Sequence, residues 1–512
     1  MPMASTIKKI TLINPPWITR DDNVWHGIKG AMPPLSILSI GAVLEAEGYE
    51  VSILDVHVEK YTEKEVAAEI KKLDPDLVGL TVMTATAIAS HRIAQIVKEV
   101  NPTTLVVMGG VHVSSMPEET LRNTAVDYVV RGDREYTLLD LCQGKNPHSI
   151  HGLSFREGNQ LVQTVNRADI KNLGALPTYA YHLIDINRYY PAVGAYKKWP
   201  AINMLMTRGC PGKCIFCNSA ETTLRTRPAD QVVDEIIHLR DTYGIKEIQF
   251  YDDTFTVMKQ NVLEFCRLMV EKKVGVTFSC FARTDCFSEK VALALKEAGC
   301  HQVMFGVESG SQDMLKILRK DIDLDKTLGV VKLAKKVGLE VRAAFTFGTP
   351  GETLETIQET LAYALKMDPD LAIFNITTPY PGTQLYNWAL KKNLLTTHDW
   401  WDYELGRAIV NMPSIPQEAL IDAYQKAFKT FYNRPKMYWK RFTKIQSLRQ
   451  FKDSFEAFSQ IILKAKFTKR GTSHKDWLNY YREDFFDIDF STSYSPAPLP
   501  KVLENLELSY SN

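Results

Sequence analysis

The feature that most constrains the fold is an alternation of short apolar segments with longer helical ones over the first 145 residues or so. Helices are expected at residues 35–47 and 89–100. The apolar segments carry hydrophobic side chains on both faces, which is typical of parallel strands covered by helices on both sides. Five such strands are expected, at residues 9–14, 51–56, 77–82, 104–110 and 126–130. This pattern predicts a doubly wound α/β domain over residues 1–150.

Small residues follow the strands of this flavodoxin-like domain. Ligands of such sheets lie beyond the carboxyl ends of the strands, near the switch in strand order. Gly109 and Gly110 follow the fourth strand, where they either leave room for a large ligand or make a tight turn. Both interpretations stay open on the residues alone.

A second α/β series begins near residue 200. Six strands are expected, at residues 201–206, 247–251, 276–281, 302–307, 340–347 and 371–376. Helical patterns separate them, at residues 231–242, 261–272, 288–298, 324–337 and 354–366. Six βα units of similar spacing predict a partial (β/α)6 barrel over residues 199–420, with its active site at the carboxyl ends of the strands.

The remaining segments have less regular patterns. Residues 151–198 are expected to be a connector that includes a hairpin near Gly158. Residues 421–495 are helical in pattern and rich in aromatic side chains, and we expect them to form a helical domain that packs on the barrel. Residues 496–512 are rich in Pro and Ser and are expected to be a poorly ordered tail.

Composition excludes several classes of protein. The 61 Lys and Arg against 60 Asp and Glu give a net charge of +1, which argues against a stable nucleic-acid partner. No apolar run is long enough for a membrane span, and the start lacks the features of a signal peptide, so we expect a cytoplasmic protein. Eight cysteines in 512 residues are too few for a disulfide scaffold. Clustered cysteines in such a chain are expected to bind metal or to act in catalysis.

Three cysteines do cluster, directly after the first strand of the second series. Cys210, Cys214 and Cys217 have the spacing C-x3-C-x2-C. A structural zinc site needs four ligands, and no second Cys or His pair lies nearby to complete one. We therefore favour a [4Fe-4S] cluster held by three thiolates, which leaves one iron open to a further ligand. Zinc or a chance spacing is the alternative.

This motif, at the start of six βα units, resembles the radical S-adenosylmethionine superfamily. The resemblance implies that the open iron chelates S-adenosylmethionine and that an electron from the cluster cleaves it to a 5′-deoxyadenosyl radical. An electron donor such as ferredoxin or flavodoxin would then be a partner. The resemblance also implies that S-adenosylmethionine is contacted by residues that follow the second, fourth and fifth strands. These residues are Tyr251, Asp252, Glu308, Ser309 and Gly348.

A flavodoxin-like domain before such a barrel resembles the cobalamin-binding subfamily, over residues 5–420. The resemblance implies that cobalamin lies between the domains with its nucleotide tail among the strand ends. Its implied contacts are Asn14, Thr81, Thr84, Gly109, Gly110, His112 and Gly132. His57 lies in a segment similar to the D-x-H-x-x-G signature of histidine-ligated cobalamin, but Lys60 replaces the glycine. We therefore do not expect His57 to ligate cobalt.

The subfamily implies a reaction as well as cofactors. The radical would remove hydrogen from an unactivated carbon, which would then take a methyl group from methylcobalamin. The methyl acceptor would be a small molecule or a protein side chain, for example a glutamine of methyl-coenzyme M reductase. Tyr380, after the sixth strand, is a candidate catalytic residue that would position substrate or relay a proton, although an aromatic residue at a turn often serves packing alone.

Three alternatives remain. The overall layout also resembles the anaerobic magnesium-protoporphyrin ester cyclase, which would make the chain an oxidative cyclase rather than a methyltransferase. A non-enzymatic cobalamin carrier is disfavoured because a carrier needs no barrel. A tRNA methylthiotransferase is disfavoured because Cys142 is the only cysteine upstream of the motif and cannot hold a second cluster.

Overall fold

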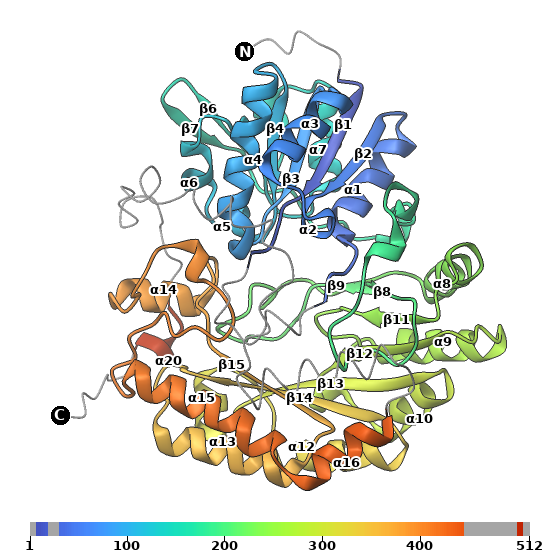
Figure 1. Cartoon of the computed structure of the whole chain (residues 1–512), viewed down its shortest axis with the longest axis vertical. Helices are drawn as coiled ribbons and strands as arrows, with labels where there is room; N and C mark the ends of the chain where they lie inside the picture. Colours follow the sequence, from blue (N-terminus) through green and yellow to red (C-terminus); the bar gives the residue numbers. More distant parts are fainter. Residues whose placement is uncertain (1–6, 19–29, 445–498, 505–512) are drawn as a thin grey trace.

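The structure is a computed structural model, and it describes residues 7–18, 30–444 and 499–504 (Figure 1). The first sheet has the strand order β2-β1-β3-β4-β5-β6-β7. Its first five strands are parallel: β1 (Lys9–Asn14), β2 (Glu50–Asp55), β3 (Leu77–Thr81), β4 (Leu105–Gly109) and β5 (Tyr128–Val130). The order of these five strands is that of flavodoxin-like sheets. The predicted fold of the first domain is therefore confirmed.

Helices cover both faces of this sheet. α1 (Leu35–Ala46) and α7 (Glu135–Cys142) bury apolar side chains against one face. α3 (Glu63–Leu73) and α4 (Ala87–Val100) do so against the other. The first turn of α3 is closed by Thr62 in a capping box, which satisfies backbone N–H groups that the helix leaves unpaired.

The predicted hairpin near Gly158 extends this first sheet. Its strands are β6 (Leu153–Glu157) and β7 (Gln160–Gln163), and β6 pairs antiparallel with β5. An antiparallel strand can follow a parallel one through a short connection, because no crossover helix is needed. Part of the expected connector is thus built into the sheet of the first domain.

The second sheet has six parallel strands in the order β15-β14-β13-β12-β11-β8. They are β8 (Ala201–Met204), β11 (Glu247–Phe250), β12 (Thr277–Ala282), β13 (Cys300–Glu308), β14 (Glu340–Phe347) and β15 (Leu371–Ile376). The intervening helices are α8 (Ala229–Tyr243), α9 (Lys259–Glu271), α10 (Glu289–Glu297), α12 (Leu324–Lys336) and α13 (Leu354–Met367). The sheet stays open between β8 and β15, so the predicted partial barrel is confirmed.

The strand expected at residues 201–206 ends early. The chain instead forms the short strand β9 (Thr207–Arg208), which pairs antiparallel with β10 (Arg225–Thr226). The buried carboxylate of Asp252 causes the break, because it accepts hydrogen bonds from the backbone N–H groups of Met206 and Thr207. The cysteine motif lies in the loop between β9 and β10.

Helices α14 (Gln384–Lys391), α15 (Gln417–Tyr432) and α16 (Pro435–Lys444) follow the second sheet. The helical region expected from residue 421 thus begins within α15, and the rest of that prediction, over residues 445–495, lies outside the described residues. Within the tail expected to be poorly ordered, the short helix α20 (Lys501–Glu504) buries Leu503 beside Trp388. An apolar contact of this kind orders that part of the tail. Among the residues described, no helix is both long and apolar enough to cross a bilayer.

The two domains face one another through their ligand-binding ends. In Figure 1, α2 (Val56–Glu59) and α5 (Val111–Ser115), which follow β2 and β4, point toward the second domain. In the same view, β8 and β9 lie below α2, at the side of the second sheet from which the cysteine loop starts. The ligand ends of both sheets therefore meet at one junction.

Candidate active site at the domain junction

The cysteine loop is held in a compact shape by its own backbone. Gly209 has φ +91°, and a Cβ there would lie 2.3 Å from the carbonyl oxygen of Thr223, so only glycine fits at the turn. The Cys210 N–H donates to Thr222 Oγ1 at 2.9 Å, and the Cys217 N–H donates to the carbonyl of Cys214 at 3.2 Å. The three cysteines are thereby presented on one short, folded loop.

The three thiols of this loop are the candidate ligands of an iron–sulfur cluster. All three are free of disulfides, and burial raises the pKa of Cys217 to about 11, with smaller raising contributions from Asp253, Cys214 and Cys210. In the described chain, no three His, Cys, Asp or Glu side chains form a site for a single metal ion. In a [4Fe-4S] cluster, each of three thiolates would bind a different iron.

Two cations that the sequence reasoning missed stand beside the cysteine loop. Lys320 Nζ donates to Glu308 Oε1 at 3.1 Å, and Arg283 forms two hydrogen bonds with the carboxylate of Asp285. Arg283 NH1 also lies 3.0 Å from where a Cβ on Gly212 would be, inside the loop. Arg283 directly follows β12, so the rule that selected Tyr251 after β11 also pointed to it.

Glu308 lies at an irregular position of β13. Its φ is +69°, and the pairing of β13 with β14 shifts register between Gly306 and Glu308. Such a bulge re-aims a side chain at the end of a strand. Here it turns the carboxylate toward Lys320, close enough to Cys214 to influence the thiol, whose pKa is raised by burial, lowered by Lys320 and raised by Glu308.

The side chains of Tyr251 and Asp252 make contacts within the protein. The Tyr251 ring stacks on Phe281 with centroids 5.5 Å apart, and its hydroxyl donates to Gln249 Oε1 at 3.1 Å. Asp252 is fully buried, and its Oδ1 accepts a bond from Thr207 Oγ1 at 2.6 Å besides the backbone donors given above. Burial raises the pKa of Asp252 to about 6, although these donors lower it. Its carboxylate positions the start of the cysteine loop, and a direct cofactor contact remains a prediction.

Ser309 and Gly348 are also engaged within the second domain. Ser309 is buried, lies 3.1 Å from Thr360 Oγ1, and accepts a hydrogen bond from the Ser311 N–H. Gly348 has φ +75°, and a Cβ there would lie 2.8 Å from the Leu420 side chain on α15. Whether either residue contacts S-adenosylmethionine stays a prediction.

A narrow pocket, partly open to solvent, lies between strands β1, β3 and β4 of the first sheet and helices α1 and α7. Thr81 and Gly109 line it, as predicted for cobalamin contacts, together with Gly79 and the apolar side chains of α1. Thr81 Oγ1 and Ser36 Oγ are 3.2 Å apart at its edge. Most of the lining is apolar, which suits an aromatic group such as the base of a nucleotide tail.

Thr84 and His112 form a buried cluster beside this pocket rather than lining it. His112 Nδ1 is 3.3 Å from Thr84 Oγ1, and His112 Nε2 is 3.3 Å from Glu119 Oε2. The imidazole also packs edge-on against Trp400, with centroids 4.9 Å apart. The side chain of His112 thus makes its contacts within the protein, and these contacts anchor the segment after β4.

The other residues predicted for cobalamin lie at strand ends. Asn14 Nδ2 donates to Asp55 Oδ1 at 3.0 Å, and Gly110 has φ +136° with no room for a Cβ against the backbone of Val82. Gly132 has φ +74° and open space around it. His57 Nδ1 accepts a hydrogen bond from the Trp17 N–H at 3.2 Å. Whether these groups touch cobalamin stays a prediction, as does the absence of a histidine ligand to cobalt.

Three loops meet at the junction between the domains. A Cβ on Gly382, after β15, would lie 2.3 Å from Ser115 Oγ at the end of α5 and 3.2 Å from Asn218 Nδ2. Asn218, one residue beyond the last cluster cysteine, donates to the carbonyl of Pro381 at 2.8 Å. The loop that follows β15 therefore contacts both α5, which follows β4, and the cysteine loop after β9.

Tyr380 lies in the loop after β15 that makes these contacts. Its ring packs against the apolar cluster of the first domain, and burial raises the pKa of its hydroxyl to about 12. The hydroxyl is therefore protonated at neutral pH and able to donate a hydrogen bond. Its catalytic role stays a prediction.

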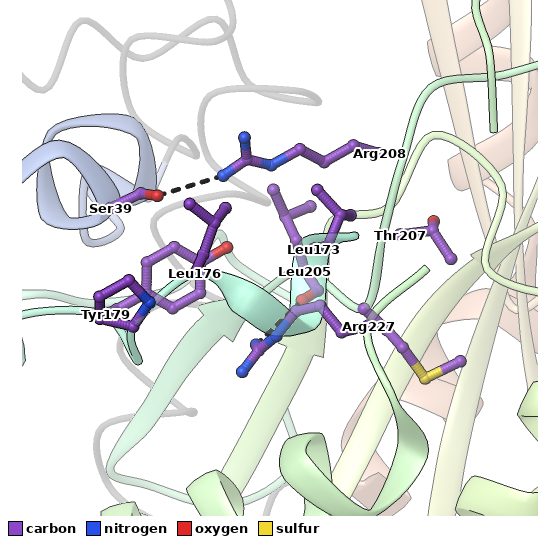
Figure 2. Close-up of a pocket in the computed structure, with 10 residues that line it drawn as sticks. Ser39, Leu173, Leu176, Tyr179, Leu205, Thr207, Arg208 and Arg227 are labelled. Carbon is purple, nitrogen blue, oxygen red and sulfur yellow. Dashed lines mark hydrogen bonds between the residues drawn. The ribbon is translucent and has the colours of Figure 1, made fainter. Parts of the chain in front are cut away.

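Polar contacts of Arg208 and Arg225 also join the two domains, and Figure 2 shows the contact between Arg208 and Ser39. Arg208 of β9 reaches to Ser39 of α1, with NH2 and Oγ 3.2 Å apart, and pairs with Glu135 at 2.7 Å. Arg225 of β10 pairs with Asp133. These partly buried contacts fix the first domain over the strands that bracket the cysteine loop.

This fold and this junction define a two-domain enzyme that binds a corrinoid in one domain and an iron–sulfur cluster in the other. Residues 24–141 match the B12 binding domain, and residues 204–364 match the radical SAM superfamily. The chain belongs to the cobalamin-binding radical S-adenosylmethionine enzymes. Its cofactors are accordingly cobalamin, S-adenosylmethionine and a [4Fe-4S] cluster.

Two relatives and one solved structure illustrate the similarity. The chain is 35% identical over 439 residues to the uncharacterized methyltransferase PH0819 of Pyrococcus horikoshii, covering 84% of this chain and 94% of the relative. It is 27% identical over 438 residues to the anaerobic magnesium-protoporphyrin IX monomethyl ester cyclase of Rubrivivax gelatinosus, covering 83% and 78%. The fold matches the cobalamin-dependent S-adenosylmethionine radical enzyme OxsB with a TM-score of 0.66 at 16% identity, covering 91% of this chain and 74% of that one.

Proposed function

We propose that the protein is a cobalamin-dependent radical S-adenosylmethionine methyltransferase that acts on an unactivated carbon of a protein side chain or a metabolite. A glutamine of methyl-coenzyme M reductase is one acceptor of the first kind. We further propose that it works in the cytoplasm with an electron donor such as ferredoxin or flavodoxin, and without a stable nucleic-acid partner. The similarity to the methyltransferase of Pyrococcus horikoshii supports the reaction class.

One observation carries this proposal, namely the contact of the three loops at the domain junction. The loop after β15 touches both α5, which follows β4 of the first domain, and the cysteine loop. A methyl donor in the first domain and a radical generator in the second must act on one carbon, so their binding sites must adjoin. When bound, the cluster and S-adenosylmethionine supply a hydrogen-abstracting radical, and cobalamin supplies the methyl group.

The residues of this chain have separate tasks in that scheme. The three thiolates hold the cluster, and Arg283 and Lys320 provide the positive charge that suits the carboxylate of S-adenosylmethionine. Glu308 is an acceptor suited to its ammonium or ribose hydroxyls. Asp252 keeps the start of the cysteine loop in place. Tyr380 would position the substrate or relay a proton through its hydroxyl, whose pKa burial raises to about 12.

The test is anaerobic reconstitution with S-adenosylmethionine that carries a deuterated methyl group, in the presence of cell extract. Peptides and small molecules are then scanned by mass spectrometry for the labelled increment. A labelled product that disappears when the cluster cysteines are replaced by alanine supports the proposal. Cleavage of S-adenosylmethionine without any labelled product would contradict it.

Oxidative ring closure is the second candidate, because the chain is similar to the magnesium-protoporphyrin ester cyclase over most of its length. The mass of the product separates the two reactions. Methyl transfer adds a CH₂ unit, whereas cyclisation adds none. A product that lacks the label but requires the cluster would favour the cyclase.

A further inference from the structure

The pocket lined by Thr81 and Gly109 is called the corrinoid pocket below. Arg134 is a cation at its rim, and the proposed reaction does not use this cation. It is the residue before α7 and lines the pocket together with Gly109 and Leu138. Its aliphatic stem lies across Gly109, because a Cβ on that glycine would be 2.9 Å from Arg134 Cδ. The absence of a side chain at Gly109 thus makes room for Arg134.

The guanidinium of Arg134 lacks a partner within the described chain. Its Nε is buried and has no hydrogen-bond acceptor there, and no carboxylate of the described residues forms an ion pair with it. Burial lowers the pKa of Arg134, while Glu135 raises it and Arg208 lowers it. A buried donor without an acceptor is costly, so a native site that keeps one is expected to have a ligand for it.

The acidic residues next to Arg134 in the sequence form ion pairs with other arginines. Asp133 pairs with Arg225 and lies 3.7 Å from Arg208, and Glu135 pairs with Arg208 at 2.7 Å and accepts a bond from Ser39. Three guanidinium groups therefore share two carboxylates at this junction. The site has one positive charge more than its own side chains balance, which favours an anionic ligand.

The other residues that line the pocket indicate which kind of chemical group the anion belongs to. Leu12, Val107 and Leu138 give the pocket apolar walls, and the Leu12 side chain packs closely over Gly79, where a Cβ would lie 2.9 Å from it. An apolar slot with one cation at its rim suits an aromatic base joined to an anionic linker. The nucleotide tail of cobalamin has this composition, since a phosphodiester joins its benzimidazole ribotide to the corrin.

We propose that Arg134 binds the phosphodiester of the cobalamin tail and makes the chain select complete cobalamin over corrinoids that lack the tail. The inference rests on cobalamin being the cofactor of the proposed function. Arg134 is here a specificity-determining residue for the cofactor. Its phosphate contact would satisfy the buried donor and balance the excess positive charge.

The experiment compares the full-length protein with Arg134→Met and Arg134→Lys. Dissociation constants are measured for aquacobalamin and for diaquacobinamide, which has neither phosphodiester nor base, by quenching of tryptophan fluorescence. The control is Arg122→Met, which removes the same charge from an exposed position of α6 (Pro117–Arg122) outside the pocket lining. No turnover is required.

We expect Arg134→Met to weaken aquacobalamin binding on the order of 10-fold or more, because it removes a charged hydrogen bond. Diaquacobinamide affinity should stay within about twofold, Arg134→Lys should fall between, and the control should match the wild type. Equal losses for both corrinoids in Arg134→Met, or no loss for either, would overturn the inference while leaving the proposed function intact. A wild type that binds neither corrinoid would overturn both.

Discussion

The buried carboxyl of Glu352 should make the stability of the protein depend on pH in a way that one substitution removes. Glu352 follows β14, is fully buried, and accepts a hydrogen bond from the Thr349 N–H at 3.0 Å through Oε2. Its Oε1 is buried without a hydrogen-bond partner. Burial raises the pKa of Glu352 to about 7, from 4.5, despite the lowering effect of the bonds to Thr349 and Gly348.

The size and sign of the effect follow from linkage. A carboxyl whose pKa is higher in the folded state than in the unfolded state favours folding when protonated. This contribution is complete below pH 4.5 and is lost as the pH rises through about 7. At about 1.4 kcal/mol for each pKa unit, the loss amounts to roughly 3 kcal/mol at pH 8. Glu352→Gln replaces the acid by a neutral group of the same shape, so it should not incur this loss.

The assay is thermal unfolding of the cofactor-free chain at pH 5 and at pH 8. At pH 8, we expect Glu352→Gln to melt several degrees above the wild type, since ~1 kcal/mol raises Tm by about 2–4 °C in domains of this size. At pH 5 the difference should shrink to about a quarter of its value at pH 8, because that pH is only slightly above the ordinary pKa of 4.5. Glu355→Gln, an exposed position in the first turn of the adjoining helix α13, is the matched control. A Glu352→Gln variant that is no more stable than the wild type at pH 8 would refute the reasoning.

Three further predictions concern the site. Replacing any cluster cysteine by alanine should abolish the iron–sulfur absorption near 400 nm of reconstituted protein. The far-ultraviolet circular dichroism should stay intact. Iron retention at the wild-type level would contradict the ligand set. Asp252→Ala leaves the N–H groups of Met206 and Thr207 without their acceptor, and should lower iron content measured after gel filtration, whereas exposed Asp241→Ala should not. Gly382→Ala has no room for its methyl group against Ser115 and should weaken aquacobalamin binding several-fold, and unchanged affinity would show that the junction adapts freely.

The strands and the cysteine loop were predictable because their signals are local. Doubly apolar runs bounded by turns specify buried parallel strands, and three cysteines within eight residues need no tertiary information to be recognised. The end of β8 was not predictable, since residues 205 and 206 are as apolar as the strand. Asp252, 45 residues or more away along the chain, draws the backbone out of the sheet there.

The polar residues at the strand ends were the least predictable. The rule that active-site groups follow parallel strands selected Ser309, but it does not say which way a side chain turns. Ser309 turns inward to Thr360, 51 residues further on, whereas Lys320 and Arg283 turn toward the cysteine loop. Orientation depends on such distant partners, so residue type and position alone could select the region but not every member of the site.

The contacts around α5 explain how the two domains keep a shared site aligned. Glu119 lies beside His112 of α5 and accepts a hydrogen bond from Trp400 Nε1 at 2.7 Å, from the segment that follows the second sheet. Burial raises the pKa of Glu119, but His112 and Trp400 outweigh it and keep the carboxyl ionised. The Glu119 carboxylate therefore ties α5 to the second domain at His112. About one helical turn further along α5, Ser115 meets Gly382 of the second domain. Because these contacts are buried and directional, the loops of the two sheets should move as one body when substrate enters.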